Sequence, residues 1–393
     1  MGVFLLQHAI DLNNVWMVAA VWLLLAAAGA FISIRIKMPA ALVEIILGFL
    51  AGNLIALRTN AWIDFLAGFG SILLTFLAGA EIDPAVLRKQ LLPSTVLGAA
   101  SFATPFLAAM AYAYFFGHWS PQASKIAGIA MSTTSVAVVY AVMVESGLAG
   151  KEFGQLILAA CFFTDLGTVV ALGLLFANYN LWLAALAAAI VASIVLVPKM
   201  LPALIESTRQ YVSEPALRAL FAVIFLLAAI AGYAKSEGVL PAYFLGLACA
   251  GVMVSYPDVK RRLQTMTMTL LAPFYFLKAG TYVEFGAAVS SGALIAMLFC
   301  VKILAKIAGV LPLARYAFKY SKENAGYLTL MMATGLTFGT ISSLYGLTHH
   351  YITQAQYTAL VTVVILTAVV PTAVAQTLLR PAREPDEMEA EVP

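Results

Sequence analysis

The run Cys161-Phe162-Phe163-Thr164-Asp165-Leu166-Gly167 places one carboxylate in the middle of an apolar stretch. No other charged residue occurs between Gln155 and Ala177, which is long enough for a helix that crosses a bilayer. At about 1.5 Å per residue, Asp165 lies roughly 15 Å from the nearer end. An ionisable group at that depth marks an ion or proton pathway, and a protonated Asp that only hydrogen-bonds a neighbouring helix is the structural alternative.

The composition indicates a polytopic membrane protein. Of 393 residues, 63% are hydrophobic and 10% are charged, and the mean hydropathy is +0.95. A soluble core cannot bury that much apolar surface. The basic residues form no clustered stripe, so we expect no nucleic-acid partner. Cys161, Cys249 and Cys300 show no paired spacing, so we expect small core residues, with neither a disulfide framework nor a structural zinc site.

Hydropathy predicts thirteen transmembrane helices, and the first apolar segment is expected to be retained because no basic region precedes it. The predicted spans are 14–34, 40–57, 61–80, 91–116, 121–146, 155–177, 180–201, 215–234, 239–256, 265–283, 286–311, 324–347 and 355–379.

The distribution of Lys and Arg predicts the orientation. Sixteen of the 22 basic residues fall on the side that follows odd-numbered spans, three fall on the other side, and Lys278, Lys302 and Lys306 lie within spans. Because cytoplasmic segments carry the excess of positive charge, we expect the N-terminus outside and the C-terminus in the cytoplasm. The membrane would be a bacterial-type plasma membrane. Residues 381–393 would form a short acidic cytoplasmic tail.

Two polar interruptions occur at comparable places in the two halves of the chain. They are the runs Met131–Val136 and Ala333–Thr340, rich in Ser, Thr and Gly. Such residues compete with helical hydrogen bonding, so each helix can break there, with Thr133, Thr337 and Gly339 in the broken backbone. Close helix packing is the alternative for either run alone. The paired occurrence favours two inverted six-helix repeats.

Several motifs, in this order, resemble the cation:proton antiporter family that includes Kef, NapA and GerN proteins. They are Pro39–Gly48, Leu73–Asp83, Ser132–Ala137, the pair Thr164-Asp165, Pro273–Phe276 with Gly280, and the embedded Lys302. Together they cover roughly residues 38 to 375. The pair Thr164-Asp165 departs from relatives, which place Asp, Asn or Gln before the essential Asp.

The resemblance implies an all-α elevator fold of the NhaA/NapA type, usually a homodimer, in which a core domain moves against a scaffold domain. The expected segments are 1–90 (scaffold), 91–178 (core), 179–213 (linker helix and cytoplasmic loop), 214–284 (scaffold), 285–380 (core) and the tail 381–393. No nucleotide-binding regulatory domain is expected, because no Gly-rich fingerprint follows the last span.

The expected activity is exchange of a monovalent cation for a proton, because both ligands compete for the Asp165 carboxylate. Hydroxyls of Thr164, Thr134 and Ser135 would add oxygen ligands for the cation. With one carboxylate, one proton per cation and electroneutral exchange are the simplest outcome. Na⁺ is favoured, K⁺ and Li⁺ are alternatives, and no cofactor is expected.

We expect different roles for the three lysines that lie within predicted spans. Lys302 would stabilise the helix breaks, pair with Asp165 or carry a proton, whereas Lys306 would extend its amine toward the membrane surface. Lys278 and Glu44 are candidates for lining the cavity. Lys278 would pair with Glu44 or Glu284, and a purely structural ion pair is equally consistent with the sequence.

Other functional classes fit less well. A K⁺/H⁺ antiporter of the same fold is the first alternative, and a sodium-coupled symporter of an organic solute is the second. A channel lacks a filter-like Gly-Tyr-Gly repeat. An intramembrane protease, and with it an enzyme, is set aside because Asp165 is the only acid in the middle of a span.

Overall fold

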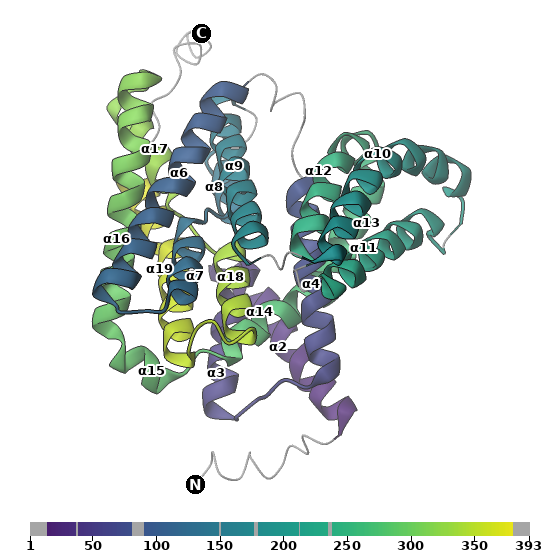
Figure 1. Ribbon diagram of the computed structural model, residues 1–393, viewed down its shortest axis with the longest axis horizontal. Helices are drawn as coiled ribbons and strands as arrows, with labels where there is room; N and C mark the ends of the chain where they lie inside the picture. The colour runs from purple at the N-terminus through teal and green to yellow at the C-terminus, as the bar shows by residue number, and fades with distance from the viewer. Residues whose placement is uncertain are drawn as a thin grey trace. The chain divides into compact units, whose positions relative to one another are not determined.

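The computed structural model describes residues 14–36, 38–80, 90–148, 151–176, 180–211, 213–234 and 238–379, and the regular elements within these ranges are helical (Figure 1). Nine helices in these ranges are long and apolar enough to cross a membrane, and two shorter apolar helices accompany them. The chain is therefore a polytopic helical membrane protein. Outside the described residues lie Lys37, Glu81, Ile82, Asp83, Arg88, Lys89, Lys235, Arg380, Arg383 and the predicted acidic tail.

The chain divides into two compact units, residues 1–89 with 169–289 and residues 90–168 with 290–393. The predicted scaffold segments lie in unit 1, apart from residue 90, and so does the whole predicted linker segment 179–213. The predicted core segments lie mostly in unit 2. Among the described residues, α9 (Glu152–Leu175) and the short α15 (Phe285–Ser290) cross a boundary between the units.

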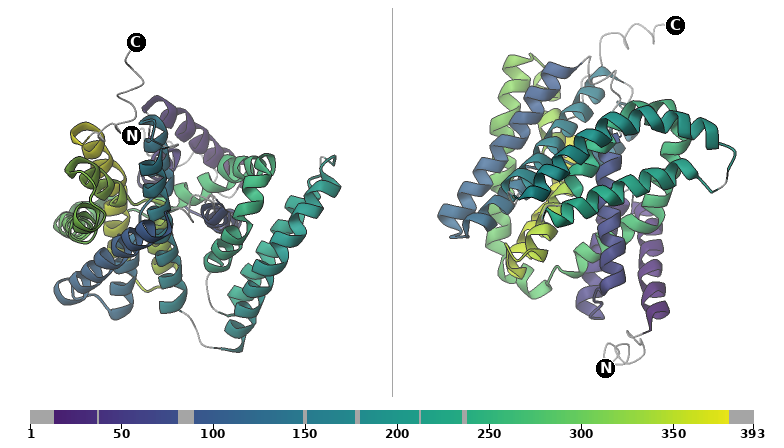
Figure 2. Two further views of the ribbon diagram at one scale, coloured as in Figure 1. Left: turned by 90° about the horizontal axis from the view of Figure 1, so that it is seen from above. Right: turned by 45° about the vertical axis from the view of Figure 1, so that its right-hand side comes forward.

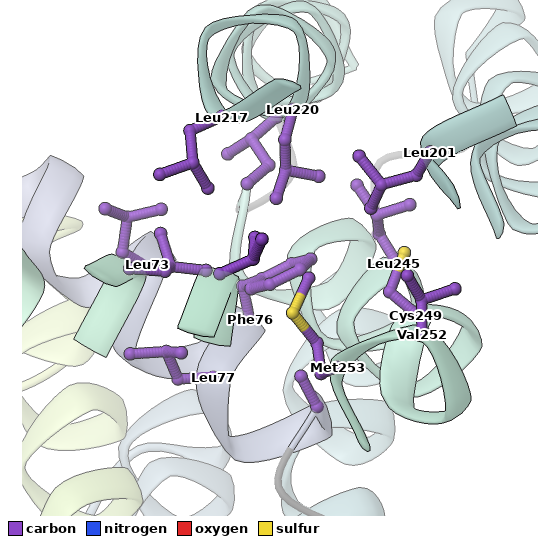
Figure 3. Packing of buried hydrophobic residues seen from close by; sticks show 14 of the residues in the cluster. Leu73, Phe76, Leu77, Leu201, Leu217, Leu220, Leu245, Cys249, Val252 and Met253 are labelled. Carbon is purple, nitrogen blue, oxygen red and sulfur yellow. The ribbon is translucent and has the colours of Figure 1, made fainter. Parts of the chain in front are cut away.

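Unit 1 is built from α2 (Val15–Ile36), α3 (Ala40–Leu54), α4 (Ala61–Ala80), α10 (Leu181–Thr208), α11 (Pro215–Tyr233), α12 (Val239–Ser255), α13 (Pro257–Met266), the π-helical turn η2 (Thr267–Leu271) and α14 (Ala272–Thr281). Helix α10 packs along α11 and α12 (Figure 2). Figure 3 shows a core cluster of this unit, in which Phe76 of α4 lies among side chains of α10, α11 and α12.

Two helix pairs in unit 1 approach closely enough to require glycine. A Cβ on Gly48 of α3 would lie 2.1 Å from the Leu277 carbonyl oxygen of α14. A Cβ on Gly246 of α12 would lie 2.0 Å from the Phe76 carbonyl oxygen of α4. Small residues at such contacts let membrane helices pack backbone to backbone. Any larger residue at either position would separate the pair.

Unit 2 contains the same succession of elements twice. Helix α6 (Leu91–Ala111) continues into the π-helical turn η1 (Tyr112–Phe116), and α16 (Gly292–Pro312) continues into η3 (Leu313–Ala317). A residue with positive φ follows each turn, His118 at 51° and Lys319 at 59°. Each succession then enters a broken helix, so the two halves of unit 2 share one local architecture.

Each broken helix begins at a serine cap. The Ser120 hydroxyl accepts the Ala123 amide ahead of α7 (Pro121–Ser132), and the Ser321 hydroxyl accepts the Asn324 amide ahead of α17 (Lys322–Met332). Residues 133–135 and 334–336 interrupt the two helices before α8 (Val136–Glu145) and α18 (Thr337–Thr348). Helix α19 (Gln354–Leu378) follows, opened by a capping box at Thr353.

Two expectations from the sequence differ from the structure. Residues 257–264 were expected to be a cytoplasmic loop, but they form most of α13, which has Pro257 at its first position and Asp258 in its first turn. Both residues favour a helix start, and hydropathy cannot detect a polar helix. Cys300 was expected in the core but is exposed on α16, whereas Cys161 and Cys249 are buried.

Candidate functional site

Asp165 lies in the unit 2 part of α9 and is only 3% exposed. One helical turn before it on the same face is Cys161, which is fully buried. Asp165 interacts electrostatically with Cys161 and with Lys306 of α16. The carboxylate therefore lies in the interior of unit 2, close to an amine on another helix.

The first break, residues 133–135, is fully buried and hydrogen-bonded to the second. The Thr134 hydroxyl donates to the Met332 carbonyl at 3.0 Å, and the Ser135 amide donates to the Thr334 hydroxyl at 3.4 Å. The Thr133 hydroxyl turns back to the Ala130 carbonyl at 3.1 Å. The two interruptions are thus joined to each other by side-chain and backbone contacts.

Lys306 has its amine at the first break. Its Nζ donates to Ser101 Oγ at 2.7 Å, to the Ser132 carbonyl at 2.8 Å and to Thr134 Oγ1 at 3.3 Å. Lys306 is 0% exposed, so the expectation that it extends to the membrane surface is wrong. The oxygen atoms at the C-terminal end of α7, where the helix dipole is negative, hold the amine inside unit 2.

Lys302 lies one turn earlier on α16, also 0% exposed, and its amine is at the second break. Its Nζ donates to Thr367 Oγ1 of α19 at 3.2 Å. A Cβ on Gly335 would lie 2.3 Å from this Nζ and 3.0 Å from Thr133 Oγ1. The structure therefore places a different lysine at each break.

The other predicted cation ligands already make hydrogen bonds. The Thr164 hydroxyl donates to the Ala160 carbonyl at 3.1 Å and to the Gly98 carbonyl at 3.3 Å. The Ser135 hydroxyl accepts the Val138 amide at 3.4 Å. These hydroxyls keep unused acceptor capacity, because each has two lone pairs.

The second interruption comes slightly earlier in the chain than Thr337 and Gly339. Both residues lie in the first turn of α18, and the interruption itself is Thr334, Gly335 and Leu336. A Cβ on Gly339 would lie 2.7 Å from Val364 Cγ2 of α19, so the start of α18 packs tightly. Gly339 therefore permits a close approach just after the break.

Lys278 and Glu44 both lie in unit 1. The Lys278 Nζ pairs with the Asp64 Oδ1 of α4 at 2.7 Å, a partner that the sequence analysis did not name. The sequence offered no signal for this pairing, because the two residues are on helices far apart in the chain. Glu44 is 5% exposed, and its Cγ would lie 3.0 Å from a Cβ on Gly29.

The chemistry gathered in unit 2 suits a hard monovalent cation and a proton. Around the first break lie hydroxyl and carbonyl oxygens, the ligand type that hard cations prefer. In the described part of the chain, no cluster of three or more His, Cys, Asp or Glu residues can hold a metal ion. Sequence reasoning missed Lys306 and Ser101. The spacing of four residues between Lys302 and Lys306 was the available signal, because such residues share a helix face.

The broken helices and the buried carboxylate define a membrane protein of the ion-transporter type. The chain belongs to the family described as "Sodium/hydrogen exchanger, transmembrane", whose model matches residues 20–380. This match confirms the resemblance to monovalent cation:proton antiporters.

Individual relatives agree with the family. The Na(+)/H(+) antiporter of Enterococcus hirae is 25% identical over 362 residues, covering 87% of this chain and 92% of its own length. The Na(+)/H(+)-K(+) antiporter GerN of Bacillus cereus is 24% identical over 349 residues, covering 86% and 89%. The solved structure of the sodium proton antiporter MjNhaP1 from Methanocaldococcus jannaschii matches with a TM-score of 0.69 at 18% identity, covering 92% of this chain and 97% of that one. The structural match establishes a shared fold.

Proposed function

We propose that this chain is a secondary antiporter that exchanges a monovalent cation, preferentially Na⁺, for H⁺, with both ligands competing for Asp165. The observation that carries the proposal is the buried Asp165 carboxylate in unit 2, together with the oxygen-rich first break and the Lys306 amine. Relatives from Enterococcus hirae and Bacillus cereus are described as Na⁺/H⁺ antiporters, which supports the same activity here.

In this mechanism a cation and a proton are alternative ways to neutralise Asp165. A charged carboxylate in a low-dielectric interior is costly, so the carrier changes state only when a ligand is bound. Thr134, Ser135 and Thr164 supply hydroxyl oxygens, and water completes the coordination. A cation at the first break would compete with the Lys306 amine, because that amine donates to Thr134 and to the Ser132 carbonyl.

Coupled transport follows if unit 2 carries the ion and moves as the core of an elevator, with unit 1 as the scaffold. The two broken helices then belong to inverted repeats, and the duplicated succession of elements in unit 2 supports this assignment. A single carboxylate and one cation per cycle give electroneutral exchange. A homodimer in a bacterial-type plasma membrane, with the N-terminus outside, completes the proposal.

Potassium is the alternative substrate. The Bacillus cereus relative GerN is described as an Na(+)/H(+)-K(+) antiporter. The site offers no charge difference with which to separate the two ions, so selectivity rests on ligand number and cavity size. The alternative activity is K⁺/H⁺ exchange at the same residues.

The test is exchange in proteoliposomes that contain an internal pH dye. Na⁺, K⁺ or Li⁺ is added outside, with the membrane potential either clamped or free. We expect the internal pH to rise on Na⁺ addition in the wild type and to stay constant in Asp165→Asn, which removes the titrating charge at nearly constant volume. Dependence of the rate on potential would contradict electroneutral exchange. Full activity in Asp165→Asn would overturn the proposal. No response to any of the three ions would also overturn it, in favour of a solute symporter.

A further inference from the structure

Two sulfur atoms meet beside the proposed ion site. The Cys161 thiol of α9 donates to the Met332 thioether of α17 at 3.7 Å, and both residues are 0% exposed. We propose that this sulfur pair, together with the Asp165 carboxylate, binds a soft monovalent cation such as Ag⁺ or Cu⁺.

The donor set carries the assignment of the ligand. Thiolate and thioether sulfurs select soft cations, whereas Na⁺ and K⁺ prefer oxygen. The two sulfurs come from different helices, and Asp165 lies one turn beyond Cys161 on the same face of α9. A soft ion between the sulfurs therefore has two matched donors and a neighbouring negative charge.

Binding is a ligand exchange without a redox step. The Cys161 S–H bond breaks, the proton passes to water, and the resulting thiolate forms a bond to Ag⁺. The Met332 sulfur contributes a lone pair and keeps its oxidation state. The net reaction releases one proton for each Ag⁺ bound, and the new bonds replace the single S–H to S contact.

The position of Met332 gives the bound ion a mechanical consequence. Met332 is the last residue of α17, and its carbonyl accepts the Thr134 hydroxyl of the first break. An ion between Cys161 and Met332 therefore ties α9 to both interruptions. Exchange should stop while the ion remains bound.

The inference rests on the proposed function in one respect, because the route that brings Na⁺ to Asp165 also brings Ag⁺ to Cys161. The other two cysteines provide contrast. Cys249 lies in the hydrophobic cluster of Figure 3, in unit 1, and Cys300 is exposed on α16. A thiol effect that arises at either of those positions would be unrelated to the ion site.

The test is a titration of purified protein in detergent with silver nitrate in chloride-free buffer, read from the melting temperature. The control background, Cys249→Ala with Cys300→Ser, keeps Cys161. We expect wild type and control to share one midpoint. In Cys161→Ser the midpoint should rise about tenfold or more, and in Met332→Leu about threefold or more, which correspond to about 1.4 and 0.7 kcal/mol. Cys161→Ala serves as a second variant if Cys161→Ser does not fold.

Exchange measured in the same proteins separates the two proposals. Ag⁺ binding that depends on Cys161, in a protein without cation:proton exchange, would leave the soft-ion site standing and overturn the proposed function. Exchange that Ag⁺ inhibits equally in wild type and Cys161→Ser would overturn the soft-ion site. The soft-ion site would also be overturned if the silver midpoint shifted in the control background but not in Cys161→Ser.

Discussion

The two helix interruptions of unit 2 follow the same succession of elements but differ in chemistry. Both follow a π-helical turn, a residue with positive φ and a serine cap. At the second residue of the break, however, the first has Thr134, whose hydroxyl accepts the Lys306 amine, and the second has Gly335, whose missing side chain leaves room for the Lys302 amine. The repeat provides the same succession of elements twice. The lysine at the first interruption, Lys306, is the one that interacts with Asp165.

The largest difference between the breaks should appear on removal of Lys306. Lys306→Met leaves the Ser132 carbonyl without its donor and removes the amine that interacts with Asp165. We expect the free energy of unfolding to fall by about 3–5 kcal/mol and exchange to be lost. Thermal melting and the proteoliposome assay check this. Wild-type melting in Lys306→Met would show that the first break does not depend on the amine.

A side chain at Gly335 should disturb the second break. In Gly335→Ala the new Cβ would contact Lys302 Nζ and Thr133 Oγ1, so we expect a loss of about 1–3 kcal/mol in stability. Gly251→Ala in α12 is the matched control, because nothing lies within 4 Å of its Cβ position. Equal melting temperatures in the two variants would contradict the tight packing at Gly335.

Removal of Lys302 should cost much less than removal of Lys306. Lys302→Met removes the hydrogen bond from Lys302 Nζ to Thr367 Oγ1, and the Thr367 hydroxyl keeps its bond to the Val364 carbonyl. We expect a change of about 1 kcal/mol or less and retained exchange. Loss of exchange in a folded Lys302→Met protein would instead make Lys302 part of proton coupling, as one sequence-based expectation has it.

The smallest effect should come from the serine caps of the two broken helices, and it should be the same at both breaks. Ser120→Ala and Ser321→Ala each remove one hydroxyl acceptor for a helix amide. We expect each variant to lose about 1 kcal/mol. Thermal melting of the two variants should give similar shifts, and a large difference would show that the repeat does not extend to its caps.

Sequence reasoning locates features that interrupt a pattern. Asp165 and the two polar runs break long apolar stretches, so hydropathy alone points to them. Hydropathy does not show which face of a helix a residue occupies. Lys306 was judged by its distance from the helix end, although its burial depends on the face that it shares with Lys302.

Contacts between residues distant in sequence are also beyond what the sequence predicts. The pairing of Lys278 with Asp64 depends on how α4 and α14 pack, and no periodicity within either helix specifies it. The π-helical turns also leave no recognisable pattern in the sequence. They depend on a single residue inserted into a helix, which leaves composition and hydropathy unchanged.

The hydrogen bonds between the two breaks have a consequence for biosynthesis. They join Thr134 to Met332 and Ser135 to Thr334, residues 198 and 199 positions apart. While the ribosome is still translating the intervening helices, the first broken helix lacks these partners, and exposed backbone polar groups are unfavourable in lipid. Residues 133–135 therefore reach their final contacts only when the second broken helix has been made, and a chain truncated before Met332 should be recognised as incomplete by membrane quality control.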